Sequence, residues 1–296
     1  MDISVIIVNY NTKKLLEECL SSVFKFTKEI NFEVVVVDNA SKDTSVEMLK
    51  KKFPQVKLIL NKKNIGFGRA NNQGIKIAKG KYLLLLNSDT YLVENSLKKL
   101  FDVAESTQNL GVLAPQLLNE NRTIQQSAGF FPNLPQIFFW MSFLDDLPGG
   151  TNLKPFHVNH DTFYKKDQKV DWVTAAAVLI PKSIINKVGA FDDNIFMYGE
   201  EVEWCYRIKK AGLQVYFSPS TKVVHISRGS TKKIPEAAFI GEYKGLIYFY
   251  LKHKSKLALQ IARLLLKMGT LARIVIFYLL GKKQLAHSYV KVLKTA

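Results

Sequence analysis

The first ninety residues alternate between short apolar runs and longer segments in which apolar residues recur every three or four positions. The apolar runs lie at 3–8, 32–37, 56–60 and 82–86. A run that is apolar on both faces is typical of a strand inside a parallel sheet. The segments between the runs have the helical period. The pattern therefore predicts strands joined by helices, which is an α/β fold with a mostly parallel sheet.

Polar residues follow three of these strands at the point where each strand ends. They are Asn9–Thr12, Asp38–Asp43 and Asn87–Asp89. The carboxyl ends of parallel strands meet at one rim of a sheet, and this rim is where open α/β sheets bind ligands. A carboxylate there, such as Asp89, suits a divalent cation that holds a substrate's phosphates. The alternative interpretation is a turn or a helix N-cap, which Asp and Ser also favour.

A nucleotide at this rim would be held without a glycine-rich loop. No G-x-G-x-x-G follows the first strand, and no G-x-x-x-x-G-K-[ST] occurs in the chain. Gly66-Phe-Gly68 is too weak a glycine signal to carry an argument. The pattern thus argues against dinucleotide-dependent oxidoreductases and P-loop NTPases. It favours a nucleotide held by carboxylates and a metal ion.

Regular structure weakens between residues 119 and 169, where prolines and glycines interrupt the pattern. A predicted helix at 97–103 and a predicted strand at 111–115 precede this segment. Within it, residues 137–144 are densely aromatic. Two interpretations stay open for them: a helix of the core, or a lid or patch that meets lipid or a lipid-linked substrate.

The densest group of candidate catalytic residues follows Gly199, at the start of a predicted helix, and consists of Glu200, Glu201 and Glu203. Acidic side chains in a first turn complement the helix dipole. Carboxylates crowded together also repel each other, which raises the pKa of one toward the range of a general base. Glu203 and Arg207 are four residues apart, and we expect them to form a structural ion pair.

Two short strands, at 214–217 and 222–226, are predicted to close this part of the chain. His225 lies in the second one. A single histidine in a strand is more often a residue of the core than a ligand. Here the loop Ser227-Arg-Gly-Ser230 follows it, and such a loop suits phosphate contacts.

The remaining residues are predicted to be helical, with one helix at 236–251 and another from Lys256 onward. Six polar residues gather on one face of the second helix: Lys256, Gln260, Arg263, Lys267, Thr270 and Arg273. These charges argue against a membrane-spanning helix. They predict an amphipathic helix that lies in the headgroup region of an anionic membrane surface. Packing on the catalytic domain, or in a homodimer, is the alternative.

Composition narrows the class of partner. The 296 residues carry a net charge of +17, which requires an anionic partner. Residues 252–294 contain many basic groups and no acidic one, which favours a membrane surface. A nucleic-acid-binding protein is the rival class, but no binding motif appears and the carboxylates at the strand ends would repel phosphates, so we expect no nucleic-acid partner. Two cysteines and the lack of a signal-peptide pattern predict a cytoplasmic protein on the inner face of the membrane.

Together these motifs resemble the family 2 glycosyltransferases with a GT-A fold, and within them the rhamnosyltransferase-like bacterial members. The resemblance runs from about Ile3 to Ser230. It rests on Val8-Asn-Tyr-Asn11, Asp38–Asp43, Asn64–Phe67 with Asn72-Gln-Gly74, Leu86–Asp89, Asp171-Trp-Val, Phe196–Glu203 and His225. It implies a Rossmann-like catalytic domain over residues 1–235 and a helical, membrane-associating region over residues 236–296.

The resemblance also implies roles for individual residues. The nucleotide-sugar would be bound by Val8, Asn9, Tyr10, Asp38, Asn39, Gly66, Asn72, Ser88 and Asp89. Of these, Asp38 would read the pyrimidine ring. Asp89 and His225 would hold a divalent cation, Mg²⁺ or Mn²⁺. The acceptor and sugar pocket would be lined by Trp172, Ala175 and Ala176.

Glu201 falls where the family usually has the Asp of a Glu-Asp pair, and Ala175-Ala-Ala177 stands where it often shows Gly-Ala. We assign the catalytic base to Glu201, with Glu200 as the alternative. The implied reaction is a metal-assisted single displacement that inverts the sugar. It would move a sugar, with rhamnose tried first, from a dTDP- or UDP-sugar to a lipid-linked or cell-surface glycan. A non-catalytic scaffold that binds sugar nucleotides is the alternative.

Overall fold

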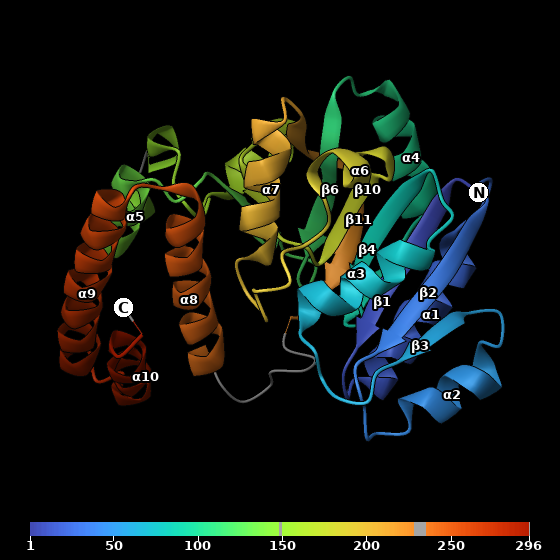
Figure 1. Ribbon diagram of the computed structural model, residues 1–296, viewed down its shortest axis with the longest axis horizontal. Helices are drawn as coiled ribbons and strands as arrows, with labels where there is room; N and C mark the ends of the chain where they lie inside the picture. The colour runs from blue at the N-terminus through green and yellow to red at the C-terminus, as the bar shows by residue number, and fades with distance from the viewer. Residues whose placement is uncertain (148–149, 228–234, 296) are drawn as a thin grey trace.

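The computed structural model describes residues 1–147, 150–227 and 235–295. Within them a sheet of nine strands forms the centre of the molecule (Figure 1). Its first half consists of β3 (Lys57–Leu60), β2 (Phe32–Asp38), β1 (Ile3–Asn9) and β4 (Tyr82–Asn87), in that order. These neighbours are all parallel. The predicted parallel α/β arrangement of the first ninety residues is confirmed.

The second half of the sheet is mixed. From β4 the order continues through β10 (Ala177–Pro181), β6 (Leu110–Leu118), β11 (Gln214–His225) and β5 (Thr90–Leu92), and β8 (Gln168–Val170) pairs with β11. β10 runs antiparallel to both β4 and β6, while β11 is parallel to β6. A second, two-stranded sheet joins β7 (Ala128–Gly129) to β9 (Trp172–Val173).

The two short strands predicted at 214–217 and 222–226 are one strand, β11. Its register against β6 shifts between Ser218 and Lys222. Pro219 lies in this interval, and a proline has no N–H group to donate to the ladder. The interruption in the sequence pattern is therefore an irregularity within a strand.

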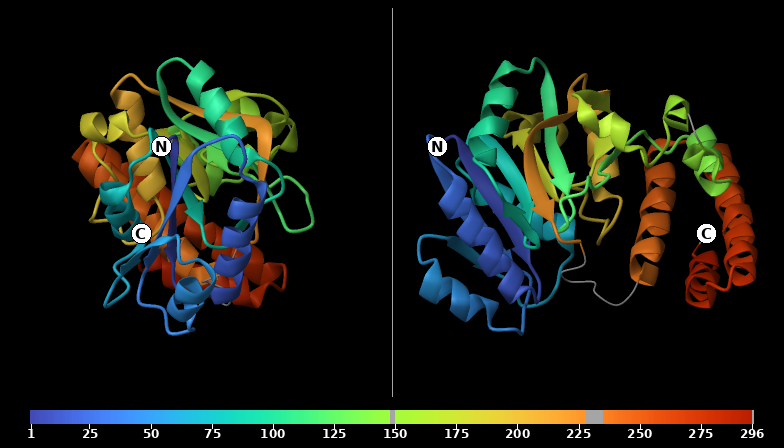
Figure 2. Two further views of the ribbon diagram at one scale, coloured as in Figure 1. Left: turned by 90° about the vertical axis from the view of Figure 1, so that its right-hand side faces the viewer. Right: turned by 180° about the vertical axis from the view of Figure 1, so that it is seen from behind.

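Helices cover both faces of the sheet (Figures 1 and 2). One face packs against α1 (Lys13–Phe26), α2 (Ser45–Lys52) and α4 (Ser96–Ser106), and the other against α3 (Phe67–Ile77), α6 (Ser183–Val188) and α7 (Glu200–Lys210). Val5 and Ile7 of β1 belong to the first core and Ile6 to the second. Successive side chains of a strand point to opposite faces, which explains why the strand is apolar throughout.

The aromatic segment at 137–144 contains α5 (Leu134–Met141), and the short 3-10 helices η1 (Leu144–Asp146), η2 (Gly150–Leu153) and η3 (Asp161–Lys165) follow it. Ile137 and Met141 are buried, while Phe138 is 46% exposed. α5 packs against α9 (Lys256–Leu279). The segment therefore joins the core through Ile137 and Met141, while the lid or lipid-facing patch stays a prediction for its exposed side chains.

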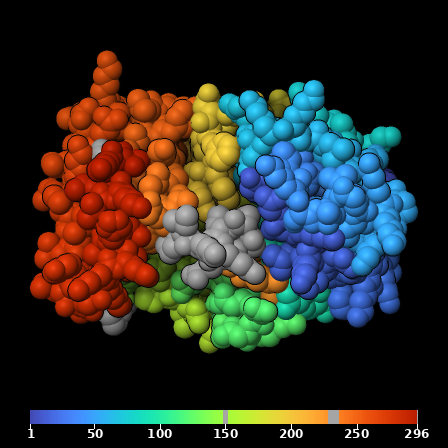
Figure 3. Space-filling model, turned by 90° about the horizontal axis from the view of Figure 1, so that it is seen from below, coloured from blue at the N-terminus to red at the C-terminus, as the bar shows by residue number. Residues whose placement is uncertain are grey.

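α8 (Pro235–His253), α9 and α10 (Lys283–Leu293) form a helical region together with α5. It lies at one end of the long axis, and β1 to β3 with α1 and α2 lie toward the other (Figures 1 and 3). The helix predicted from Lys256 onward is in fact two helices. The break is at Gly281, whose φ of 72° is a left-handed conformation that favours glycine. No helix within the described ranges is long and apolar enough to cross a membrane.

The orientation of α9 differs from the prediction. Thr270 and Arg273, on the predicted outward polar face, are buried. The Arg273 guanidinium donates hydrogen bonds to the backbone oxygens of Met141, at 2.6 Å, and of Trp140. The exposed side chains of α9 include a row of apolar residues: Leu257, Ile261, Leu264, Met268, Leu271, Val275 and Tyr278. α9 therefore packs on the protein partly through its polar residues and exposes an apolar face.

Candidate active site

The three polar strand ends lie on one rim of the sheet, as predicted. In the parallel register Asn9 is opposite Asp38, and Val8 is opposite Asn87. The Asn9 amide donates to Asp38 Oδ2 over 2.7 Å. The Thr12 hydroxyl lies within hydrogen-bond distance of both Asn9 Oδ1 and the Ser88 hydroxyl, at 2.7 and 2.8 Å. These bonds connect the ends of β1, β2 and β4 into one polar floor.

A cavity of about 370 Å³ opens above this floor. It brings together most of the residues that the sequence selected, from seven separate parts of the chain: Val8, Tyr10, Asn39, Gly66, Ser88, Asp89, Ala175, Ala176, Glu200, Glu201 and His225. Asn9 and Asp38 are buried beneath it. Asn9 donates a hydrogen bond to Asp38, and the Ser41 N–H donates to Asp38 as well. Asn9 and Asp38 therefore belong to the floor of the cavity and not to its wall.

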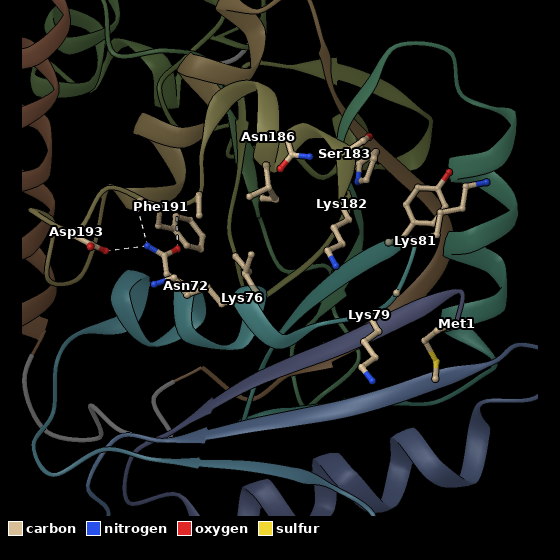
Figure 4. Close-up of a pocket in the computed structure, with 16 residues that line it drawn as sticks. Met1, Asn72, Lys76, Lys79, Lys81, Lys182, Ser183, Asn186, Phe191 and Asp193 are labelled. Atoms are coloured by element: carbon tan, nitrogen blue, oxygen red, sulfur yellow. Dashed lines mark hydrogen bonds between the residues drawn. The ribbon is translucent and has the colours of Figure 1, made fainter.

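Two further selected residues, besides Asn9 and Asp38, do not line this cavity. Trp172 lines a neighbouring cavity between α7 and α8. Asn72 faces a third one, of about 1080 Å³, near the amino end of β4, where its amide donates to Phe191 O and Asp193 Oδ1, each at 2.9 Å (Figure 4). Lysines line that third cavity, namely Lys76, Lys79, Lys81 and Lys182. The structure thus gives Asn72 contacts that join α3 to the segment preceding α7.

Asp89 and His225 meet because β5 pairs with β11. In this antiparallel pair Thr90 is opposite His225, and the N–H of Ile226 donates to the carbonyl of Asp89 at 2.9 Å. The register places His225 Nε2 at 3.3 Å from Asp89 Oδ1. A carboxylate and an imidazole that are far apart in the sequence therefore share one wall of the cavity.

Gln125 determines which nitrogen of His225 carries a proton. The Gln125 amide nitrogen donates to Asn119 Oδ1 and to the His225 carbonyl, at 3.0 and 3.1 Å. The amide oxygen must then accept, and it lies 2.7 Å from His225 Nδ1. With the proton on Nδ1, the neutral imidazole directs its Nε2 lone pair toward Asp89. Asp89 Oδ1 and His225 Nε2 are then two hydrogen-bond acceptors that face each other, and such a pair needs a proton or a cation between them.

This donor set fits a divalent cation, because a ligating histidine typically gives its other N–H to a fixed oxygen. Among the described residues no group of three or more His, Cys, Asp or Glu side chains gathers as a metal site. Asp89 and His225 would thus be two protein ligands for an ion that takes its other ligands from elsewhere. Of the loop predicted to contact phosphate, Ser227 lies 3.2 Å from His225 Nδ1. Arg228, Gly229 and Ser230 lie outside the described residues.

Glu200 and Glu201 reach the cavity from the first turn of α7. The two residues before the helix are left-handed, with φ of 72° at Tyr198 and 90° at Gly199. A non-glycine residue in this conformation is strained, and such strain is common at functional sites. Glu200 is 4% exposed. In the described part of the molecule, the Oε2 atoms of both glutamates are buried without a hydrogen-bond partner.

Burial raises the pKa of both carboxyls, because the cavity wall replaces water around the charged form. The negative charge of Glu201 raises the pKa of Glu200 further. Hydrogen bonds from the backbone at Glu201 and Gly199 lower the pKa of Glu201, and so does the charge of His157. A carboxyl whose pKa is raised in this way is suited to accept a proton near neutral pH.

Glu203 has a different role. Burial alone would raise its pKa, but hydrogen bonds from Arg207 and Lys252 outweigh burial and lower it. Arg207 Nε lies 2.9 and 3.0 Å from its two oxygens, which confirms the predicted pair. Lys252 Nζ and His253 Nε2, from α8, lie 2.8 and 3.0 Å from Glu203 Oε1. Glu203 therefore joins α7 to α8.

The sequence reasoning missed the contribution of α8 to this site. Ala238 of α8 lines the same cavity as Glu201. A Cβ added to Gly241 would lie 2.4 Å from the Tyr198 ring, and one added to Gly245 would lie 2.4 Å from the Tyr198 carbonyl oxygen. The Gly241-x-x-x-Gly245 spacing puts two glycines on one face of a helix, where they permit close approach. That spacing is the signal that could have revealed the contact.

Comparison with known proteins gives a consistent result. Residues 4–145 match the family described as glycosyl transferase family 2. An N-acetylglucosaminyl-diphospho-decaprenol L-rhamnosyltransferase of Mycobacterium tuberculosis is 26% identical over 266 residues, which cover 83% of this chain and 82% of that protein. A low-salt glycan biosynthesis hexosyltransferase of Haloferax volcanii, Agl10, is 27% identical over 222 residues, which cover 72% of this chain and 64% of that protein.

Two solved structures share the fold. A crystal structure of GalNAc-T7 with UDP, GalNAc and Mn²⁺ superposes with a TM-score of 0.61 at 18% identity, over 85% of this chain and 48% of that one. The crystal structure of S. aureus TarS gives a TM-score of 0.55 at 18% identity, over 90% of this chain and 43% of that one. This chain therefore spans less than half the length of either protein. The likeness confirms the expected GT-A fold.

Proposed function

We propose that this chain, which belongs to glycosyl transferase family 2, moves a sugar from a nucleotide-diphosphate sugar to an acceptor hydroxyl and inverts the anomeric carbon. One observation carries the proposal. A single cavity holds a candidate cation site, Asp89 with His225, and a candidate base, Glu201. Single-displacement transfer needs a group that takes the acceptor's proton and a positive charge that stabilises the departing diphosphate.

In the proposed reaction Glu201 accepts the proton of the acceptor hydroxyl. The oxygen then forms a bond to the anomeric carbon while the bond from that carbon to the diphosphate oxygen breaks. Attack from the face opposite the leaving group inverts the configuration. Glu200, the alternative base, is more deeply buried and its pKa is raised well above the usual value. A bound Mg²⁺ or Mn²⁺ would supply the positive charge at the diphosphate.

We propose the chemical class of the sugar donor from the residues that line the cavity. Tyr10 is partly exposed at the cavity, where its ring offers a surface for a pyrimidine base. Asn39 and Gly66 line the same side, and Asn39 Oδ1 accepts the N–H of Ile65. We propose a dTDP- or UDP-sugar, and dTDP-rhamnose first, because the Mycobacterium tuberculosis relative is an L-rhamnosyltransferase. By the same reasoning the acceptor is a lipid-linked or cell-surface glycan.

We also propose that the protein works on the cytoplasmic face of an anionic membrane. The row of apolar side chains on α9 is exposed, and residues 252–294 around it carry basic groups and no acidic one. A second copy of the chain would bring like charges together at this surface, whereas anionic headgroups would attract it. An apolar face flanked by lysines is the pattern of a helix that lies in the interface of a bilayer.

The test is a donor screen with dTDP-rhamnose, UDP-glucose and UDP-N-acetylglucosamine, each with Mn²⁺ or with EDTA. Thermal shift measures binding, and release of the nucleoside diphosphate measures turnover. We expect Asp89→Ala to abolish the Mn²⁺-dependent shift, and Glu201→Gln to keep the shift and lower turnover about 10²–10⁴-fold. Glu236→Gln is the control. Like Glu201→Gln it removes one negative charge, but Glu236 lies on α8 and lines none of the cavities described above.

Turnover by Glu201→Gln at the rate of the parent protein would exclude this residue as the base. If the parent protein binds a donor but never releases the diphosphate, the scaffold alternative is correct. If no donor gives a shift with Mn²⁺ or with EDTA, the site is not a nucleotide-sugar site.

A further inference from the structure

A second cavity, of about 230 Å³, lies between α7 and α8 and is lined in part by Glu201. Tyr198, Glu201 and Ala238 line both this cavity and the candidate donor cavity. The two spaces therefore meet at the side chain that we assign as the base. Figure 1 shows α7 and α8 as neighbours between the sheet and the terminal helices.

The walls of this second cavity are mostly apolar and contain several aromatic side chains. They include Phe156, Trp172, Phe239 and Phe249. The Phe156 and Trp172 rings are tilted against each other, with centroids 5.6 Å apart. The Trp172 indole N–H donates to Phe156 O at 3.0 Å, which holds this wall in place. The aromatic wall is thus a preformed surface.

One polar pair interrupts the aromatic lining. His157 Nε2 lies 2.9 Å from Glu242 Oε1, and the two side chains are 30% and 27% exposed. Each still has hydrogen-bonding capacity: a carboxylate has about four lone-pair sites, and Glu242 uses one of them on His157. Both residues line the cavity, so this capacity is available to a ligand.

Aromatic faces with a few convergent polar groups suit a sugar ring, because a pyranose has apolar C–H faces and hydroxyls around its edge. Sites for drug-sized ligands measure about 300–1,000 Å³, so a smaller cavity admits one ring rather than an oligosaccharide.

We infer that this cavity is the acceptor subsite: the acceptor's terminal sugar ring lies on the aromatic wall, with its hydroxyls bonded to Glu242 and His157 and its reacting hydroxyl at Glu201. The inference rests on the proposed glycosyl transfer and names where the second substrate binds. It also assigns a function to α8, since Ala238, Phe239 and Glu242 all belong to that helix.

The rest of the acceptor has a path away from the base. A further cavity of about 400 Å³ shares His157, Trp172, Phe239 and Glu242 with the acceptor subsite and extends to Tyr243, Arg273 and Tyr289. These last residues belong to α8, α9 and α10. The path thus ends at the helical region whose outer face is apolar, which suits an acceptor carried on a lipid chain.

Glu201 responds to the same pair. The negative charge of Glu242 raises the pKa of Glu201, and the charge of His157 lowers it. A ligand that hydrogen-bonds this pair would therefore change the environment of the base as well as its distance from the hydroxyl. Glu242→Gln should shift the acidic limb of the pH–rate profile to lower pH, because it removes a charge that raises the pKa of Glu201.

The experiment measures steady-state transfer from dTDP-rhamnose to a short-chain prenyl-diphospho-N-acetylglucosamine, with Glu242→Gln, His157→Gln and the control Glu236→Gln. We expect each of the first two to raise the acceptor KM at least tenfold. The donor KM should stay within twofold of the parent protein. The control should match the parent in every parameter.

An acceptor KM within twofold of the parent in both variants overturns the acceptor subsite and leaves the proposed transfer intact. Absence of transfer by the parent protein overturns the proposed substrates instead. If the variants fail to fold, the same acceptor with a photoreactive group on its sugar is used on the parent protein. Labelling of peptides from α8 or from residues 154–172 supports the subsite, and labelling only elsewhere overturns it.

Discussion

Glu200 and Glu201 are adjacent in the sequence and both reach the candidate donor cavity, yet they have different surroundings. Glu201 also borders the proposed acceptor subsite, where the charges of Glu242 and His157 change its pKa. Glu200 is the more deeply buried of the two, and burial is the main cause of its raised pKa. The negative charge of Glu201 raises that pKa further. Two unpartnered carboxyl oxygens in one cavity wall cost folding free energy. Such a cost is expected where a site is built for a reaction rather than for stability.

The first prediction concerns Glu200. Its folded pKa is raised above the unfolded value of about 4.3, so its contribution favours the folded state below that pH and is lost as the pH rises through the folded pKa. Glu200→Gln removes the titration. We therefore expect the Glu200→Gln variant to have the same Tm as the parent protein near the unfolded pKa. At higher pH its Tm should exceed that of the parent by a growing margin, about 2–4 °C for each kcal/mol of unfolding free energy.

The measurement is a thermal melt at several pH values between about 4 and 9. Glu236→Gln serves as the control. Glu236 forms an ion pair with Lys291, at 2.9 Å, and is more exposed than Glu200. A Tm difference between Glu200→Gln and the parent that does not change with pH would show that Glu200 is not held in a destabilised charged state.

Among the elements, α9 departs most from expectation, and Arg273 explains why. Its guanidinium donates to the carbonyls of Trp140 and Met141, the last residues of α5, and lies 4.2 Å from the centre of the Phe143 ring. The carbonyls at the end of a helix lack intrahelical partners and carry partial negative charge. A cation that satisfies them is held inside the protein instead of facing lipid headgroups.

The second prediction follows from this contact. Arg273→Met keeps much of the side chain's length and loses the charged hydrogen bonds, each worth about 1.5–3 kcal/mol. We expect a clear loss of unfolding free energy in urea denaturation. Lys267→Met, at an exposed position of the same helix, should change it little. Equal effects of the two substitutions would mean that α5 and α9 are not joined through Arg273.

The third prediction concerns the outer face of α9. Leu264 and Met268 are 57% and 59% exposed, and Leu60, in β3 of the catalytic part, is 54% exposed. The double variant Leu264→Glu, Met268→Glu should lose sedimentation with vesicles containing phosphatidylglycerol, since it removes apolar contact and adds repulsion. Leu60→Glu should sediment like the parent protein.

Sedimentation of the double variant at the level of the parent would reject the membrane surface. Size-exclusion chromatography without lipid tests the remaining alternative, which is a homodimer. If the parent protein is a dimer and the double variant a monomer, then the apolar face of α9 joins two copies of the chain.

At the scale of the molecule, the helical region and the sheet-containing part form a common site. α8 lies against the turn before α7 through Gly241 and Gly245, and Lys252 and His253 bond to Glu203 of α7. The same helix supplies one wall of the donor cavity and several residues of the acceptor subsite. The division into a catalytic domain at 1–235 and a helical, membrane-associating region at 236–296 stays a prediction, and in the structure α8 of the second region lines both cavities.

The fourth prediction tests this assembly. Gly245→Ala would place a Cβ 2.4 Å from the Tyr198 carbonyl oxygen, so α8 must move away from the turn that precedes Glu200. We expect lower Tm together with a loss of transfer of at least tenfold, although residue 245 bears no functional group. Lys244→Ala, its exposed neighbour, should be close to the parent protein in both. A Gly245→Ala variant with full transfer activity would show that α8 is not needed in this position.

The amino-acid sequence alone is enough to predict the parallel half of the sheet, the rim that carries the candidate site and the acidic start of α7. These features depend on periodicity and on the alignment of parallel strand ends, which are local properties of the chain. For this reason the order of residues along the chain is enough to select Asn9, Asp38 and Asp89.

The second half of the candidate site depends instead on the packing of the folded chain. His225 reaches Asp89 because β11 pairs with β5, and Gln125, 100 residues away, orients its ring. The proximity of α8 to Glu201, the inward side of α9 and the contacts of Asn72 likewise depend on segments that are distant in the sequence. Periodicity shows which face of an element is apolar, whereas the packing of the whole chain decides what that face meets.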